Sequence, residues 1–164
     1  MPPIFYAAGM KYHTGTYTDE LRAMGIPAPW TYGTADRVRF GEIDALHHVN
    51  HTAYLRWFET FRISYFRDYG LSDYGPDSPR IVLKSITAEF IKEMVFGQDY
   101  MVTGRTVSFR KTSWVMDYAV WTDQGLQATG SSVLVQLDPA TGAKKPLSEQ
   151  VTSTFITRDG AAKA

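Results

Sequence analysis

Acidic and imidazole side chains are concentrated in one short stretch, from residue 42 to residue 51. Glu42 and Asp44 are followed by three of the four histidines of the chain, His47, His48 and His51. A carboxylate can act as a nucleophile or as a general base that activates water, and imidazoles transfer protons or bind metal ions. This stretch is therefore the first place to look for a reactive site.

A long amphipathic helix is predicted directly after these residues. Asn50 and Thr52 are both good N-cap residues, and Gly70 suits a left-handed helix end. Aromatic side chains recur between them at spacings that place them on one helical face, Tyr54, Phe58, Phe61, Tyr65 and Tyr69. We expect this face to pack on the core, so that the helix start lies beside Asp44.

The start of this helix offers a second chemical function. The unpaired amides of the first turn and the helix dipole form a small electropositive site. A carbonyl oxygen docked there would be polarised, as in an oxyanion hole, while Asp44 attacks the carbonyl carbon or activates a water. On residue type alone, the alternative that Asp44 only caps a turn stays open.

The stretch from Asp44 to Glu59 resembles the signature of the hotdog-fold acyl-CoA thioesterases of the 4-hydroxybenzoyl-CoA thioesterase type. That signature is D-x-x-G-H-V-x-x-x-x-Y-x-x-x-F-E, and the chain reads D-A-L-H-H-V-N-H-T-A-Y-L-R-W-F-E. The resemblance extends over residues 36–137. It implies that Asp44 is the catalytic carboxylate, that the amide at His51 polarises the thioester carbonyl, and that Tyr54 is the family tyrosine of the first helical turn.

The same resemblance assigns other residues of the loop. His48, Asn50 and Tyr54 are expected to shape the substrate-binding site or to form hydrogen bonds in it. His47 departs from the pattern, because the family usually has glycine there, so either the acyl pocket is reshaped or the loop follows another path. Glu59 matches a family acid, and its position opposite the aromatic face favours a structural or subunit-contact role.

A basic pair, Arg110 and Lys111, is predicted at the tip of a hairpin. The segment R-K-T-S-W resembles an R-R-K-S-F-like stretch of the family, whose basic side chains contact the phosphates of coenzyme A. The resemblance thus implies charge-assisted contacts to phosphate. The alternative, a hairpin tip that is charged only because it is solvated, stays open. Lys84 and Arg105 are weaker candidates without a motif.

The pattern of strands predicts an α+β fold. A short strand is expected at Val38–Phe40 before the helix, and four more are expected at 81–91, 100–109, 113–121 and 126–137. The short breaks at 96–99, 110–112 and 123–125 predict antiparallel hairpins. Only the aromatic helix is large enough to cover such a sheet. The result is an antiparallel sheet wrapped around a long central helix, the hotdog arrangement that the resemblance also implies.

Three parts of the chain are distinguished. Residues 1–35 form an N-terminal extension with a short helix that starts at a Thr18 cap and ends at Gly25. Residues 36–150 form the hotdog thioesterase domain, and residues 151–164 form a C-terminal tail of short helix or coil.

Composition excludes several classes of protein. The 164 residues include 17 basic and 17 acidic side chains, which gives no general attraction to nucleic acid or to an anionic membrane. The absence of cysteine excludes disulfides, thiolate–zinc sites and a cysteine nucleophile. No apolar run approaches the ~20 residues of a membrane span, and no signal-peptide pattern is present. A cytoplasmic protein is expected.

The function expected from these observations is hydrolysis of an acyl-CoA thioester by a homodimer or tetramer, without cofactor or metal. Three alternatives remain. The histidines could form a divalent-metal site with Asp44 and Glu42, as in a metal-dependent hydrolase. The chain could be a hotdog dehydratase. It could also be an acyl-CoA-binding protein that lacks turnover.

Overall fold

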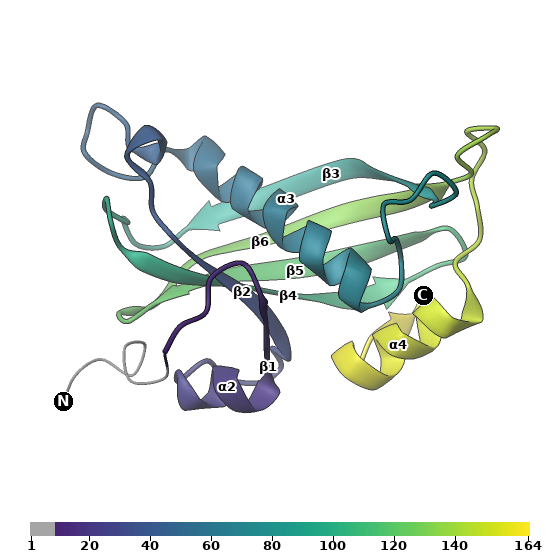
Figure 1. Ribbon diagram of the computed structural model, residues 1–164, viewed down its shortest axis with the longest axis horizontal. Coiled ribbons are helices and arrows are strands. Elements are labelled where there is room, and N and C mark those ends of the chain that lie inside the picture. The colour runs from purple at the N-terminus through teal and green to yellow at the C-terminus, as the bar shows by residue number, and fades with distance from the viewer. Residues whose placement is uncertain (1–8) are drawn as a thin grey trace.

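The computed structural model describes residues 9–164, and its centre is a seven-stranded sheet packed against one long helix (Figure 1). In chain order the strands are β1 Gly15–Tyr17, β2 Tyr32–Arg37, β3 Arg80–Phe90, β4 Asp99–Phe109, β5 Ser113–Thr122, β6 Gly125–Leu137 and β7 Ala162–Lys163. The helices are α2 Thr18–Ala23, α3 His51–Asp68 and α4 Glu149–Asp159, with a short 3-10 helix, η1, at Phe40–Glu42. The expected α+β hotdog fold, with its sheet around the central helix α3, is confirmed.

The sheet has the order β1-β2-β4-β5-β6-β3, with β7 beside the end of β4. The hairpins that join β4 to β5 and β5 to β6 are antiparallel as predicted. The hairpin predicted at residues 96–99 is wrong, because β3 pairs with β6 and not with β4. The connection instead passes beneath the loop before α3, where Met94 is fully buried and its carbonyl accepts a 2.8 Å hydrogen bond from the amide of Val49. As a result, β3 is an edge strand.

The strand predicted at Val38–Phe40 is also wrong. The chain pairs with β4 as β2 and leaves the sheet after Val38, whose amide donates to the carbonyl of Gln98 at 2.9 Å. Phe40 is 79% exposed and begins η1. The sheet strand therefore lies several residues earlier than its apolar pattern indicated.

The proposed divisions of the chain can be placed on these elements. The division between residues 35 and 36 falls within β2, and that between 150 and 151 falls within α4. Residues 1–8 of the N-terminal extension lie outside the described part of the chain. The short helix of the extension is present as α2, but its N-cap is Tyr17 and Thr18 is its first residue.

Helix α3 forms as its sequence predicts. The side chain of Asn50 caps it by accepting a 2.9 Å hydrogen bond from the amide of Thr52, and Gly70 follows its end with φ of 76°. The five residues of the aromatic face are each at most 3% exposed. Burial of each such ring stabilises the fold by about 1.5–3 kcal/mol. No helix within residues 9–164 is long and apolar enough to span a bilayer.

Two glycines of the sheet allow this helix to pack closely. A Cβ atom at Gly104 would lie 2.4 Å from the ring of Phe61, and one at Gly130 would lie 2.6 Å from the ring of Phe58. Both rings thus occupy space that any other residue would fill with its side chain. These two contacts set the depth at which α3 sits on the sheet.

The C-terminal end of α3 is held by a buried carboxylate from α4. Oδ2 of Asp159 accepts hydrogen bonds from the hydroxyl of Tyr65 at 2.5 Å and the amide of Thr106 at 2.7 Å. Oδ1 accepts from the hydroxyl of Tyr69 at 2.6 Å. Asp159 is 4% exposed, and burial raises its pKa. This carboxylate therefore joins α3, β4 and α4 at one point.

Candidate active site

The loop before α3 is a tight hairpin. Ile43 and Val49 form an antiparallel bridge, the amide of Asp44 donates to the carbonyl of His48 at 2.9 Å, and the amide of His47 donates back to the carbonyl of Asp44 at 3.0 Å. His47 has φ of 65°, a left-handed conformation that glycine adopts without steric cost. The histidine thus takes the backbone conformation for which the family pattern uses glycine.

One carboxylate oxygen of Asp44 is engaged by the described part of the chain and the other is not. Oδ1 accepts a 2.8 Å hydrogen bond from the amide of Leu46, so Asp44 does cap the turn. Within residues 9–164, Oδ2 has no hydrogen-bond or ion-pair partner, and the side chain is partly exposed. Capping and reactivity are therefore compatible, because each can use its own oxygen.

Glu42, the second acid of the stretch, is fully occupied. Its Oε1 accepts from the indole nitrogen of Trp57 at 2.8 Å, and its Oε2 accepts from the amide of Arg39 at 2.8 Å. Its carbonyl also accepts from the amide of Asn50 at 2.7 Å. Glu42 therefore fixes the loop to the first turns of α3. This role was not predicted, and the indole N–H on the core face of the helix is the one signal that could have indicated it.

The start of α3 has one amide that bonds to none of the described residues. Asn50 Oδ1 accepts from both the amide and the hydroxyl of Thr52, at 2.9 and 2.8 Å, and the carbonyl of Asn50 accepts from the amide of Ala53. In the described part of the chain, the amide of His51 donates to no protein acceptor. The His51 side chain is exposed. Since its oxygens are engaged, Asn50 can offer a substrate its side-chain amide nitrogen.

His48 and Tyr54 have different surroundings. His48 Nε2 lies 3.0 Å from the carboxylate of Glu93 on the segment after β3. Tyr54 is buried between Trp57, at 4.8 Å between ring centroids, and Phe90, at 5.0 Å. Burial raises the pKa of Tyr54 to about 12, so its hydroxyl is neutral near pH 7. Its contact with Phe90 places the end of β3 beside the first turn of α3.

The histidines do not converge on a metal site. Within residues 9–164, no three His, Cys, Asp or Glu side chains are grouped in a way that could hold a metal ion. His48 faces Glu93, and both carboxylate oxygens of Glu42 already accept hydrogen bonds. The donor set of a metal-dependent hydrolase is therefore not assembled by this loop.

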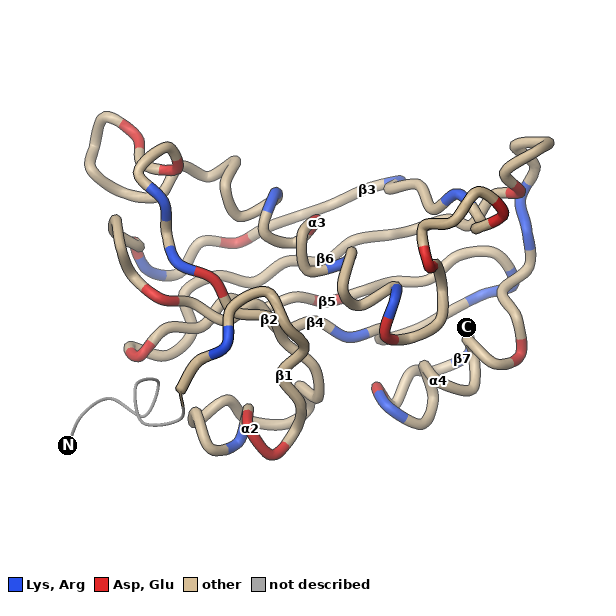
Figure 2. The backbone as a smooth tube through the Cα atoms, in the orientation of Figure 1, with Lys and Arg blue, Asp and Glu red and all other residues tan. Residues whose placement is uncertain are grey.

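The predicted coenzyme A residues lie at the other end of the sheet. Arg110 and Lys111 line a pocket of about 500 Å³ that Lys84 and Lys144 also line. Lys84 is the extra residue of a β-bulge in β3, which changes the direction of its side chain. Asp99, the first residue of β4, lies near the Asp44 end, and the 11 residues of this strand span roughly 33 Å. Lys and Arg segments lie at both ends of the molecule in Figure 2, but the turn between β4 and β5 lies at the end of the sheet opposite the loop before α3 (Figures 1 and 2). One chain therefore does not bring Asp44 and Arg110 together.

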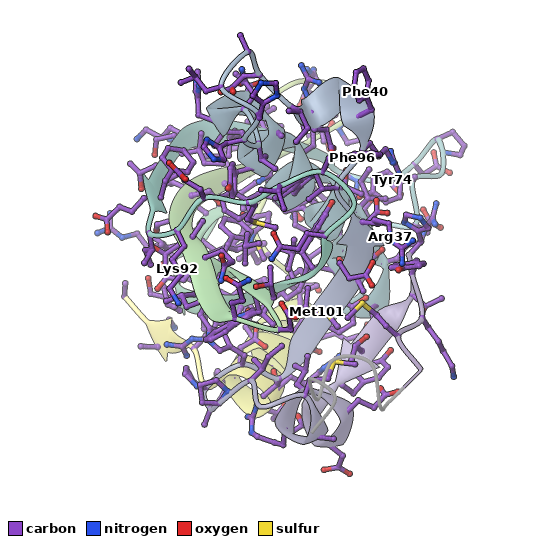
Figure 3. All side chains as sticks on the ribbon, turned by 90° about the vertical axis from the view of Figure 1, so that its left-hand side faces the viewer. Arg37, Phe40, Tyr74, Lys92, Phe96 and Met101 are labelled. Atoms are coloured by element: carbon purple, nitrogen blue, oxygen red, sulfur yellow. The ribbon has the colours of Figure 1, made fainter. Side chains whose placement is uncertain are left out.

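Exposed apolar side chains surround the Asp44 end of the molecule. Phe40 and Phe96 lie against each other, with ring centroids 6.0 Å apart (Figure 3). Leu46, at the tip of the hairpin, is 75% exposed. Grouped apolar residues of this kind mark surfaces that contact another molecule. No local sequence pattern indicated this group, since its members come from separate turns.

Comparison with known proteins identifies the family. A family model described as the thioesterase-like superfamily matches residues 38–155. A thioesterase superfamily structure from Jannaschia sp. CCS1 is 46% identical, with a TM-score of 0.91, and the match covers 94% of this chain and 99% of that one. A thioesterase from Thermus thermophilus, complexed with coenzyme A and Zn, is 27% identical over 78% of this chain and 93% of that one, with a TM-score of 0.69.

More distant structures share the fold. A 1,4-dihydroxy-2-naphthoyl-CoA thioesterase from Synechocystis is 15% identical, with a TM-score of 0.67 over 77% of this chain and 96% of that one. No curated protein matches the chain. Since the family model spans most of the chain, and the hairpin and helix that carry the signature lie within it, the chain belongs to the thioesterase-like superfamily.

Proposed function

We propose that the protein is an acyl-CoA thioesterase. The observation that carries the proposal is the pairing, within one hairpin and helix start, of a carboxylate oxygen on Asp44 with an amide at His51, neither of which has a partner among the described residues. The first is a base or nucleophile, and the second is a hydrogen-bond donor at the positive end of a helix dipole. These are the two groups that attack on a thioester carbonyl requires.

The reaction follows from these two groups. The thioester carbonyl oxygen accepts a hydrogen bond from the His51 amide, which stabilises the negative charge that develops on that oxygen. Either Asp44 takes a proton from the attacking water, or its Oδ2 attacks the carbonyl carbon and water then cleaves the resulting anhydride. In both routes the carbon–sulfur bond breaks, and coenzyme A leaves as a thiolate and gains a proton. The products are a free acid and coenzyme A.

Coenzyme A is the thiol that the surroundings support best. The Thermus thermophilus relative was crystallised with coenzyme A, and the pocket lined by Lys84, Arg110, Lys111 and Lys144 offers several cations for its phosphates. None of the described residues that line this pocket is acidic. A thioester whose thiol carries phosphates is therefore a better fit than one that lacks them.

A homodimer would unite the two separated parts of the site. The edge strand β3 has exposed positions along its length, including Leu83 and Phe90. If two copies pair antiparallel through β3 about a two-fold axis, the Arg80 end of one strand lies beside the Phe90 end of the other. The basic pocket adjoins the first end and Asp44 adjoins the second. Each site would thus take its carboxylate from one subunit and its phosphate contacts from the partner.

A hydrolysis screen tests the proposed activity. Short, long and aromatic acyl-CoAs are incubated with the protein, and release of the thiol of coenzyme A is measured. We expect at least one class to be hydrolysed with saturation kinetics. Saturable binding of acyl-CoA without release of thiol would instead identify an acyl-CoA-binding protein and reject the enzyme.

A mixing experiment tests the shared site. Subunits carrying Asp44→Asn are combined with subunits carrying Arg110→Ala and Lys111→Ala, at low acyl-CoA. A mixed dimer has one intact site of two, so a random mixture should regain about a quarter of wild-type activity. No regain, or a fully active monomer in light scattering, would contradict the shared site.

A further inference from the structure

Arg62 is a buried cation that has no acidic partner in the described part of the chain. The residue lies on α3 and is 7% exposed, and it takes part in none of the ion pairs found in residues 9–164. Its Nη1 donates to the hydroxyl of Tyr118 at 3.2 Å, and its guanidinium carbon lies 5.8 Å from the centre of that ring. An acidic partner would offset the cost of burying this charge. Among residues 9–164, no Arg62 nitrogen is both fully buried and without a hydrogen bond, so the remaining guanidinium donors are accessible to such a partner.

The contact with Tyr118 does not supply that partner. The Tyr118 hydroxyl accepts from Arg62 and shares a 2.5 Å hydrogen bond with the hydroxyl of Ser132. This chain of hydrogen bonds is neutral and leads into the sheet. The other guanidinium nitrogens have no protein acceptor among the described residues, and Arg62 lines a groove beside α3.

This groove has apolar walls and a basic character. Its volume is about 710 Å³, and it runs between α3, β3 and the loop of residues 72–79. Arg56, Arg62 and Arg80 line it together with the acid Glu59. Of these four, only Arg62 is buried. The apolar side chains of the lining come from α3, β3 and β6. They include Leu55, Phe66, Ile81, Val82, Ile86 and Leu134. A ligand with an apolar body and one anionic end matches this lining.

The groove begins near the proposed reaction centre. Leu55 lines it one turn after His51, and Arg62 lies further along the same helix. The rise of an α-helix separates the backbones of His51 and Arg62 by roughly 16 Å along the axis. Helical side chains lean toward the N-terminus, which brings the guanidinium closer to the helix start. A carbonyl at His51 and an anion at Arg62 would therefore be joined by an acyl chain of medium length.

We propose that this groove binds the acyl group of the substrate and that Arg62 pairs with a carboxylate at its far end. The preferred substrates are then ω-carboxyacyl-CoAs, the monothioesters of dicarboxylic acids. This inference rests on the proposed thioesterase function and names its substrate class. A bidentate pair between guanidinium and carboxylate would supply the missing partner of the buried cation.

Matched substrates test the role of the carboxylate. Adipyl-CoA is compared with hexanoyl-CoA, and suberyl-CoA with octanoyl-CoA, so that each pair differs only at the chain end. For the wild type we expect kcat/KM to be about tenfold or more higher for the carboxylated member. Arg62→Gln should lower kcat/KM for the carboxylated substrates about 10- to 100-fold and change it little for the neutral ones. Arg67→Gln, an exposed arginine of the same helix that does not line the groove, should leave both unchanged.

The outcomes separate this inference from the proposed function. If the wild type hydrolyses both members of each pair equally, the inference about Arg62 is overturned and the proposed thioesterase function stands. This result is expected if a carboxylate of a partner subunit occupies the groove. Hydrolysis of no acyl-CoA would reject the function, and calorimetric titration with adipate then decides whether Arg62 binds a carboxylate. If Arg62→Gln does not fold, Arg62→Lys retains the charge without the planar fork, and the selectivity should fall but not vanish. Unchanged selectivity in that variant would count against the pair.

Discussion

An aspartate from another element lies beside each end of α3, Asp44 from the preceding hairpin and Asp159 from α4, and the two carboxylates differ in how completely they are bound. At the C-terminal end, Asp159 is 4% exposed, and both of its oxygens accept short hydrogen bonds from Tyr65, Tyr69 and Thr106. At the N-terminal end, Asp44 is partly exposed and uses one oxygen to cap a turn. A carboxylate with a full set of donors holds structure together, whereas one with a spare oxygen is available to react.

The largest effect should follow from removing the spare oxygen. Asp44→Asn keeps the shape of the side chain and its cap on Leu46, but it removes the proposed base or nucleophile. We expect kcat to fall about a hundredfold or more, with the free energy of unfolding little changed. Steady-state kinetics on a responsive acyl-CoA and denaturant unfolding measure the two quantities. Near-normal turnover in the folded variant would refute the catalytic assignment.

The same substitution at the other end should give the opposite result. Asp159→Asn places an amide NH₂ where hydrogen-bond donors now converge, so a buried donor loses its acceptor. The free energy of unfolding should fall by about 2 kcal/mol, while kcat of the folded protein stays near the wild-type value. Urea denaturation with activity assays below the transition checks this. Equal losses of turnover in both variants would remove the contrast between the two ends.

The pocket lined by Arg110 and Lys111 lies at the same end of the sheet as Asp159, so it gives a further test of how the two ends differ. Arg110→Ala with Lys111→Ala should raise KM for acyl-CoA about tenfold and leave kcat largely intact, since phosphate contacts are equal in ground and transition states. A pantetheine thioester, which lacks the nucleotide, serves as the control and should be unaffected. A similar change in KM for both substrates would exclude a phosphate role.

The smallest effect concerns backbone strain in the hairpin that carries Asp44. His47→Gly relieves a left-handed conformation, so the free energy of unfolding should rise by up to about 1 kcal/mol, reduced by the greater entropy of glycine in the unfolded chain. Equilibrium unfolding in urea measures the change, with His13→Gly, a second histidine of positive φ outside the loop, as a reference. A loss of stability in His47→Gly alone would mean that the His47 side chain makes stabilising contacts.

Local patterns predicted much of this molecule. The bounds of α3, its aromatic face and the extents of β3, β4, β5 and β6 follow from periodicity and turn residues, which act over a few residues. The family signature drew attention to the hairpin where an unoccupied carboxylate oxygen and an unoccupied amide are found. The strand that was wrongly predicted at residues 38–40 shows the limit of periodicity. A short segment with an apolar residue and an exposed residue is as typical of a turn as of an edge strand.

Contacts between distant parts of the chain could not be predicted. Strand β3 pairs with β6 because β6 is a free edge of the sheet once β4, β5 and β6 have paired. The shortness of the connection between β3 and β4 does not indicate which edge is free. Asp159 is 94 residues from Tyr65, and Arg62 is 56 residues from Tyr118. No local pattern links such residues. A polar residue within an apolar helical face, such as Arg62 one position after Phe61, was the only available sign.

The close packing of α3 on the sheet has a consequence for how this sequence can vary. Because the rings of Phe61 and Phe58 fill the space that side chains at Gly104 and Gly130 would occupy, neither partner can change alone without a clash or a cavity. Gly104→Ala should become tolerable only together with a smaller residue at position 61, and the two substitutions should show a strongly favourable coupling energy. Positions 61 and 104, and likewise 58 and 130, are therefore expected to change together among relatives, so that substitutions in the helix accompany substitutions in the strands beneath it.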